Sequence, residues 1–162
     1  MSFQSLLRGL VQDGVWFVVV GGVAAAAHGS PRVTNDLDIC YDAEPANLDR
    51  LARLLAQWSA YPRGADAGLH FIMDARTLTD APLLTLQTTE GDLDVMDQVP
   101  GVGGFREVLQ ASVALRAFGI EFAALDLPAL IASKRAAARP KDWAQLPELT
   151  ALLELRREER GS

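Results

Sequence analysis

The chain has 162 residues, about half of them apolar, a formal net charge of −6 and one cysteine, Cys40. This composition predicts one soluble globular domain over 1–162, with a core over about 15–126 and a helical segment over about 127–158. A single cysteine excludes an internal disulfide framework, and the net negative charge argues against broad electrostatic binding of nucleic acid without excluding a local basic patch.

Apolar periodicity predicts the elements in chain order. We expect a helix over 3–12, a strand over 15–20, a short helix on the alanine run that ends near Gly29, and a strand over 36–41. A helix follows on the apolar stripe from Leu48 to Trp58. The next predictions are strands at 69–73, 83–89 and 92–98, a helix near 105–112 and strand character over 114–125. The C-terminal third is predicted to contain a helix over 128–138, a short turn or helix from about 141, and a final helix starting near Pro147.

These elements predict an α+β fold of two layers. The two opening helix–strand units and the later hairpin, with its turn at Gly91, indicate a mixed sheet with helices packed on it. The apolar run from Val15 to Ala27 is too short to cross a bilayer, and Gly21-Gly22 divides it. We therefore expect a cytoplasmic protein with no membrane partner.

Asp36 and Asp38 are the strongest candidates for chemistry. Residues i and i+2 of a strand point to the same face, so both carboxylates project together while Leu37 points into the core. Their mutual repulsion would be relieved by a cation, and hard oxygen ligands favour Mg²⁺ or Mn²⁺ held together with substrate phosphates. The alternative is a solvated acidic pair at a strand edge, which is the commoner meaning of an isolated Asp-x-Asp.

Gly21 and Gly22 end the apolar strand that precedes this pair. Glycines at that point let backbone N–H groups approach a phosphate, and the following helix adds the positive end of its dipole. A tight strand-to-helix turn without a ligand is the equally weighted alternative.

The order of an apolar strand, a glycine pair, a short helix and an Asp-x-Asp strand resembles the DNA polymerase beta-like nucleotidyltransferase superfamily. The matching segments are VVVGGVAAAAHGSPRVTNDLDI over 18–39 and GDLDVM over 91–96. The resemblance covers roughly residues 15–155 and implies the nucleotidyltransferase fold, with Asp94 as the third metal ligand beside Asp36 and Asp38. Asp92, two residues earlier on the same predicted face, is left open as a substitute or assistant. The chain departs from many relatives at Gly22, where they carry a serine whose hydroxyl contacts phosphate.

The segment LPALIASKRAAARPKDW over 127–143 resembles small bacterial nucleotidyltransferases related to abortive-infection and toxin–antitoxin systems. The resemblance implies that Lys134 completes the catalytic site, that Arg139 and Asp142 assist substrate binding or orientation, and that Arg32 contacts phosphates or a polynucleotide acceptor. The chain has only two lysines, Lys134 and Lys141. Lys134 lies on an otherwise apolar helical face, where an ammonium requires an anion or must extend to solvent. Asp142 can equally be a first-turn acid of the next helix.

The resemblance therefore implies a metal-dependent transfer of a nucleoside monophosphate from a nucleoside triphosphate to an acceptor hydroxyl, with release of pyrophosphate. In this reading Asp36 and Asp38 hold two cations, and Asp94 ligates the one on the acceptor side. The acceptor stays open between an RNA 3′ end, a protein and a small molecule such as an antibiotic, and an antitoxin partner is a further expectation. The alternative from another class is a catalytically silent nucleotide-binding or interaction module of the same fold.

Overall fold

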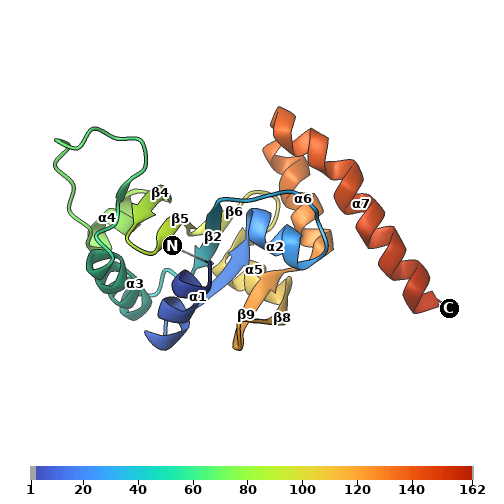
Figure 1. Ribbon diagram of the computed structural model, residues 1–162, viewed down its shortest axis with the longest axis horizontal. Helices are drawn as coiled ribbons and strands as arrows, with labels where there is room; N and C mark the ends of the chain where they lie inside the picture. Colours follow the sequence, from blue (N-terminus) through green and yellow to red (C-terminus); the bar gives the residue numbers. More distant parts are fainter. Residues whose placement is uncertain (1–2, 162) are drawn as a thin grey trace.

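The computed structural model describes residues 3–161, which form a mixed seven-stranded sheet, a two-stranded ribbon and flanking helices (Figure 1). The helices are α1 (Phe3–Gln12), α2 (Gly21–Ala27), α3 (Pro45–Gln57), α4 (Ala75–Asp80), α5 (Phe105–Gln110), α6 (Leu127–Ala137) and α7 (Pro140–Gly161). The strands are β1 (Phe17–Val20), β2 (Asp36–Tyr41), β3 (Tyr61–Pro62), β4 (Leu83–Thr88), β5 (Gly91–Met96), β6 (Gln98–Val99), β7 (Gly103–Gly104), β8 (Ser112–Ala117) and β9 (Ile120–Leu125).

The large sheet has the strand order β3-β4-β5-β2-β1-β9-β8. Strand β2 lies at its centre, antiparallel to β1 and parallel to β5, while β1 is parallel to β9. Hairpins add the outer strands, β4 beside β5 and β8 beside β9. This arrangement confirms the α+β class and the mixed sheet expected from the sequence.

The two faces of the central strands differ in chemistry. On one face, Leu37, Ile39 and Leu93 are fully buried. Helices cover this face: a Cβ at Gly91 would lie 3.2 Å from Leu6 of α1. The hydroxyl of Tyr41 donates to a carbonyl of α4 at 3.2 Å. Strand alternation therefore leaves the acidic residues of β2 and β5 on the opposite face.

The predicted strand at 69–73 is wrong, because this segment is an irregular connection between β3 and α4. Its backbone folds back onto Tyr61, whose hydroxyl donates to the carbonyls of Asp66 and Leu69. Of its apolar side chains, Leu69 is 50% and Ile72 58% exposed, while Phe71 and Met73 are partly buried against the core. The short helix α4, which follows, was not expected.

The predicted helix start at Pro147 is also wrong. Helix α7 begins at Pro140, after Ala138 has ended α6 in the left-handed conformation, and continues through Pro147 to Gly161. A proline within a helix removes one amide donor, normally paired with the carbonyl four residues earlier. That residue is Trp143, whose side chain lies on the exposed side of the helix. Figure 1 shows α7 extending away from the sheet toward the C-terminus.

The other predicted elements differ from the structure mainly at their boundaries. The strand character over 114–125 resolves into the hairpin of β8 and β9, and the turn at Gly91 joins β4 to β5. Among residues 3–161, no helix combines the length and the apolar character that a membrane span requires.

Candidate active site

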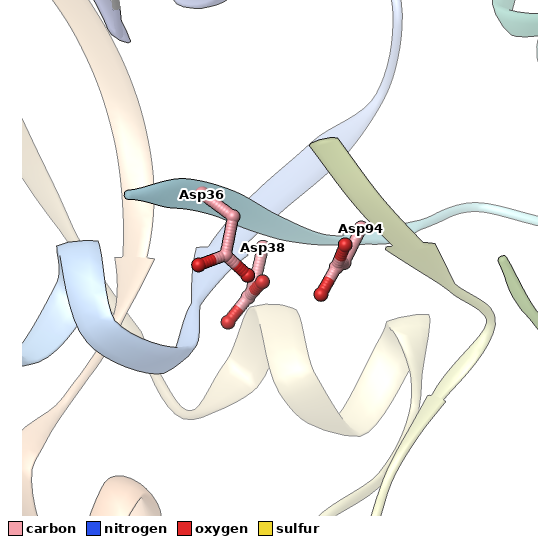
Figure 2. A group of neighbouring side chains, drawn as sticks. All are labelled: Asp36, Asp38 and Asp94. Carbon is pink, nitrogen blue, oxygen red and sulfur yellow. The ribbon is translucent and has the colours of Figure 1, made fainter. Parts of the chain in front are cut away.

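Asp36, Asp38 and Asp94 converge on the face of the sheet that the helices α1 and α4 leave uncovered. The parallel pairing of β2 with β5 places Asp36 beside Asp92 and Asp38 beside Asp94. One carboxylate oxygen from each of Asp36, Asp38 and Asp94 lies within 4.8 Å of the others. Figure 2 shows the three side chains projecting to the same side from the two neighbouring strands.

The electrostatics of this cluster favour a cation. Burial raises the pKa of Asp38 to about 8, and the charges of Asp36 and Asp94 add to the effect. Burial likewise raises the pKa of Asp94, although a neighbouring guanidinium opposes the shift. One oxygen of Asp38, Oδ1, is buried without a hydrogen-bond partner in the described structure. A buried, unpartnered carboxylate oxygen beside two further carboxylates fits a hard divalent cation such as Mg²⁺ or Mn²⁺.

Gly21 is required by the close approach of Asp38. Its φ of +64° lies in the left-handed region, and a Cβ built there would lie 2.0 Å from Oδ2 of Asp38. The turn between β1 and α2 therefore leaves room for the Asp38 carboxylate only when residue 21 has no side chain.

Gly22 is restricted by a different neighbour, Thr34. A Cβ at residue 22 would lie 2.8 Å from the Thr34 hydroxyl oxygen, which itself donates to the carbonyl of Asp36 at 3.2 Å. A serine at this position would collide with Thr34. The departure from the Gly-Ser pattern therefore fits the packing of this particular chain.

Arg63 is the charged residue of this site that the sequence analysis missed. Its Nη2 donates to Oδ1 of Asp94 at 2.6 Å, and it also lies 4.0 Å from Oδ2 of Asp36. Asp92 is less involved: its side chain is 40% exposed and lies 4.0 Å from Arg63. Among residues 3–161, the compact group consists of Asp36, Asp38 and Asp94, and this favours Asp94 over Asp92.

Lys134, Arg139 and Asp142 come together where α6 meets α7. Asp142 is fully buried, 3.3 Å from Nζ of Lys134 and 2.7 Å from Nε of Arg139. Burial opposes ionisation, but the hydrogen bonds from Arg139 and Lys134 outweigh it and lower the pKa of Asp142 to about 2. Because Asp142 is buried, its role toward a substrate would be to orient Lys134 and Arg139. Within residues 3–161 no ion pair links this cluster to the three carboxylates.

Arg32, for which a contact to phosphates or a polynucleotide acceptor was predicted, is bound to α7 in the structure. Its Nε bonds Oε2 of Glu148 at 3.0 Å and its Nη2 donates to the carbonyl of Ala144 at 3.3 Å, both on α7. Ser30 donates to the same glutamate. In this conformation Arg32 ties the loop before β2 to the C-terminal helix.

His28 and Cys40 have structural surroundings. His28 is 6% exposed and its Nε2 donates to the carbonyl of Leu125 at 2.9 Å. Burial lowers the pKa of His28. Cys40 is fully buried and unpaired, as the apolar residues around it in the sequence suggest.

Comparison with solved structures identifies the fold. The chain aligns over 92% of its length with 94% of the lincosamide antibiotic adenylyltransferase LnuA, whose structure contains lincomycin, with a TM-score of 0.60 and 15% identity. It aligns over 93% of its length with 73% of an antigenic nucleotidyltransferase-like protein from Paracoccidioides brasiliensis, with a TM-score of 0.55 and 16% identity. A nucleotidyltransferase candidate from Thermotoga maritima aligns over 100% of this chain and 97% of its own, with a TM-score of 0.51 and 14% identity.

These likenesses, at low sequence identity, establish that the chain has the nucleotidyltransferase fold. No protein-family model matches the sequence, and no curated protein sequence matches it. The fold and the converging carboxylates therefore place it among proteins of nucleotidyltransferase architecture.

Proposed function

We propose that this protein is a metal-dependent nucleotidyltransferase that moves a nucleoside monophosphate from a nucleoside triphosphate to an acceptor hydroxyl. The observation that carries the proposal is the convergence of Asp36, Asp38 and Asp94, with one oxygen from each within 4.8 Å of the others and a buried oxygen of Asp38 left unpartnered. The fold shared with nucleotidyltransferase structures supports the same reaction class.

In the proposed reaction the acceptor oxygen attacks the α-phosphorus, the bond to the β-phosphate breaks, and pyrophosphate leaves. Bound divalent cations would neutralise the phosphate charge and stabilise both the attacking and the leaving oxygens. Asp36, Asp38 and Asp94 would hold these cations. Asp94 is also the candidate acceptor of the hydroxyl proton. Gly21 supports the arrangement by leaving space for the carboxylate of Asp38.

Lys134 is proposed to bind the triphosphate. Its side chain is 15% exposed and is held by Asp142 rather than free to move in solvent. A fixed ammonium loses little further side-chain entropy when it pairs with a phosphate. Arg139, held by the same carboxylate and 56% exposed, is the second candidate for this contact.

A small molecule is the acceptor class that we favour. An RNA acceptor would need a track of available basic residues. Among the basic residues considered above, Arg32 is paired with Glu148, and Lys134 and Arg139 are already assigned to the triphosphate in this proposal. The net charge of −6 adds to the argument. The adenylyltransferase LnuA, which aligns over most of both chains, is described as acting on lincosamide antibiotics.

The test is to incubate the purified protein with each labelled nucleoside triphosphate, Mg²⁺ and a fractionated cell extract supplemented with hydroxyl-bearing antibiotics. We expect label in a small-molecule product and equimolar pyrophosphate, both abolished by Asp38→Asn. Label in RNA or protein would instead support a macromolecular acceptor, as in a toxin controlled by an antitoxin partner. Nucleotide binding in calorimetry without pyrophosphate release would indicate the silent binding module.

A further inference from the structure

Arg63 reaches the carboxylate cluster from the edge of the sheet. It follows the two-residue strand β3, and its amide donates to the carbonyl of Thr85 at 2.9 Å. Thr85 is paired with Asp94 in β4 and β5, and Asp94 is paired with Asp38 in β2. The arginine therefore stands at the end of a row of paired residues that leads to the centre of the site.

The guanidinium of Arg63 is fixed by contacts on two sides. Its Nη1 donates to the carbonyl of Leu86 at 3.0 Å, while its Nη2 donates to Oδ1 of Asp94 at 2.6 Å. The side chain is only 31% exposed. Because Nη1 is bound to the backbone of β4, the sheet fixes the position of Nη2. The orientation of the Asp94 carboxylate is therefore coupled to the backbone of β4.

The arginine does not fill the cation site itself. It uses one oxygen of Asp94 and lies no closer than 4.0 Å to Asp36, so the second oxygen of Asp94 stays available. The buried Oδ1 of Asp38 has no partner at all in the described structure. A guanidinium that occupied the position proposed for the cation would be expected to donate to this oxygen. One guanidinium among several carboxylates also leaves the site negatively charged.

We propose that Arg63 is a positioning residue that orients Asp94 for metal binding, an inference that rests on the proposed function. The guanidinium holds Oδ1 of Asp94, and the remaining oxygen is thereby directed to the gap shared with Asp36 and Asp38. Loss of such an orienting partner typically weakens metal binding about 10–100-fold. If the Arg63 guanidinium instead competed with the metal for these carboxylates, its removal would tighten metal binding. The direction in which the Kd for the metal changes therefore distinguishes a positioning role of Arg63 from a competing one.

The experiment measures Mn²⁺ binding to the purified full chain by electron paramagnetic resonance of the free ion. We expect Arg63→Gln to raise the Kd for Mn²⁺ by about tenfold or more. Arg63→Lys keeps the charge, but an ammonium lacks the fork that spans Asp94 and Leu86, so we expect only partial recovery. Arg53→Gln, on the exposed side of α3, is the matched control and leaves the Kd unchanged.

A Kd for Arg63→Gln equal to or below that of the wild type would overturn the positioning role. Thermal unfolding of each variant shows whether the fold is retained, and Arg63→Lys provides the same comparison if the glutamine variant fails to fold. Asp38→Asn separates the two proposals. If the wild type binds no Mn²⁺, or binds it equally after this substitution, the metal site and the inference from it both fail. If only the Arg63 variants behave as wild type, the inference alone fails.

Discussion

Replacement of Asp38 by asparagine should stabilise the metal-free protein while it abolishes nucleotidyl transfer. Burial, together with the charges of Asp36 and Asp94, raises the pKa of Asp38 from 3.8 to about 8. The folded chain therefore holds this proton more tightly than the unfolded chain does. As a result, the free energy of unfolding falls as pH rises from about 4 to about 8. Asparagine cannot ionise, so the variant lacks this loss of stability.

The expected gain in the free energy of unfolding follows from the pKa shift of Asp38. A full one-proton difference is worth about 1.4 kcal/mol per pH unit, so the whole interval sets a ceiling of several kcal/mol. The gain will be smaller, because the three carboxylates share their protons and Asp38 is not fully buried. We expect Asp38→Asn to raise the free energy of unfolding at pH 8 by about 2–4 kcal/mol, and we expect little difference between the two proteins near pH 4.

Urea unfolding between pH 4 and pH 8, with EDTA or with Mg²⁺, measures this effect. Added Mg²⁺ should stabilise the wild type and leave Asp38→Asn unchanged, since ligands that bind only the folded state stabilise it by mass action. Asp49→Asn, an exposed aspartate of α3, is the matched control and should keep the wild-type pH profile. A lower stability of Asp38→Asn than of wild type at pH 8 would refute the electrostatic reasoning. Equal stabilisation of both proteins by Mg²⁺ would refute the metal site.

Three further predictions follow from other contacts of the site. Gly21→Ala forces a Cβ to within 2.0 Å of Oδ2 of Asp38 at a φ of +64°, so transfer measured by pyrophosphate release should fall by about a hundredfold or more. Retention of full activity would show that the carboxylate need not occupy its observed position. Gly22→Ser collides with the Thr34 hydroxyl, and the double variant with Thr34→Gly should recover melting temperature relative to the single variant; no recovery would contradict this packing. Asp142, with its pKa lowered to about 2, contributes stability above pH 3.8 that is lost as pH falls toward 2. Asp142→Asn should therefore lower the free energy of unfolding by about 2–3 kcal/mol at pH 7 and much less near pH 2, and a constant difference across this range would count against the ion cluster.

Much of the candidate site could be predicted because its main parts are local in sequence. Asp36 and Asp38 share a face through strand alternation alone, and the glycine pair marks the turn before α2. Arg63 could not be predicted in the same way. It lies 31 residues before Asp94 in an irregular region, and only the pairing of β3 with β4 and of β4 with β5 brings its side chain to the cluster. The one available signal was a lone arginine after Tyr61-Pro62, a pair that does not by itself predict a strand.

The roles of the other basic residues also depended on tertiary contacts. The sequence showed Arg32 in a loop near the site, but Glu148, 116 residues later, decides where its guanidinium points. The sequence could not distinguish a first-turn acid from a buried partner of Lys134 at position 142, since burial depends on how α6 and α7 pack.

The sequence by itself determined the periodic elements, the mixed sheet and the paired carboxylates on one strand face, because these follow from side-chain alternation and apolar spacing along a few residues. Only the tertiary structure decided that Asp94 meets this pair, that Arg63 supports it and that residues 69–73 form no strand. Those outcomes depend on which strands become neighbours and in what register. Register is fixed by the burial of whole faces against helices and not by any short segment of the chain.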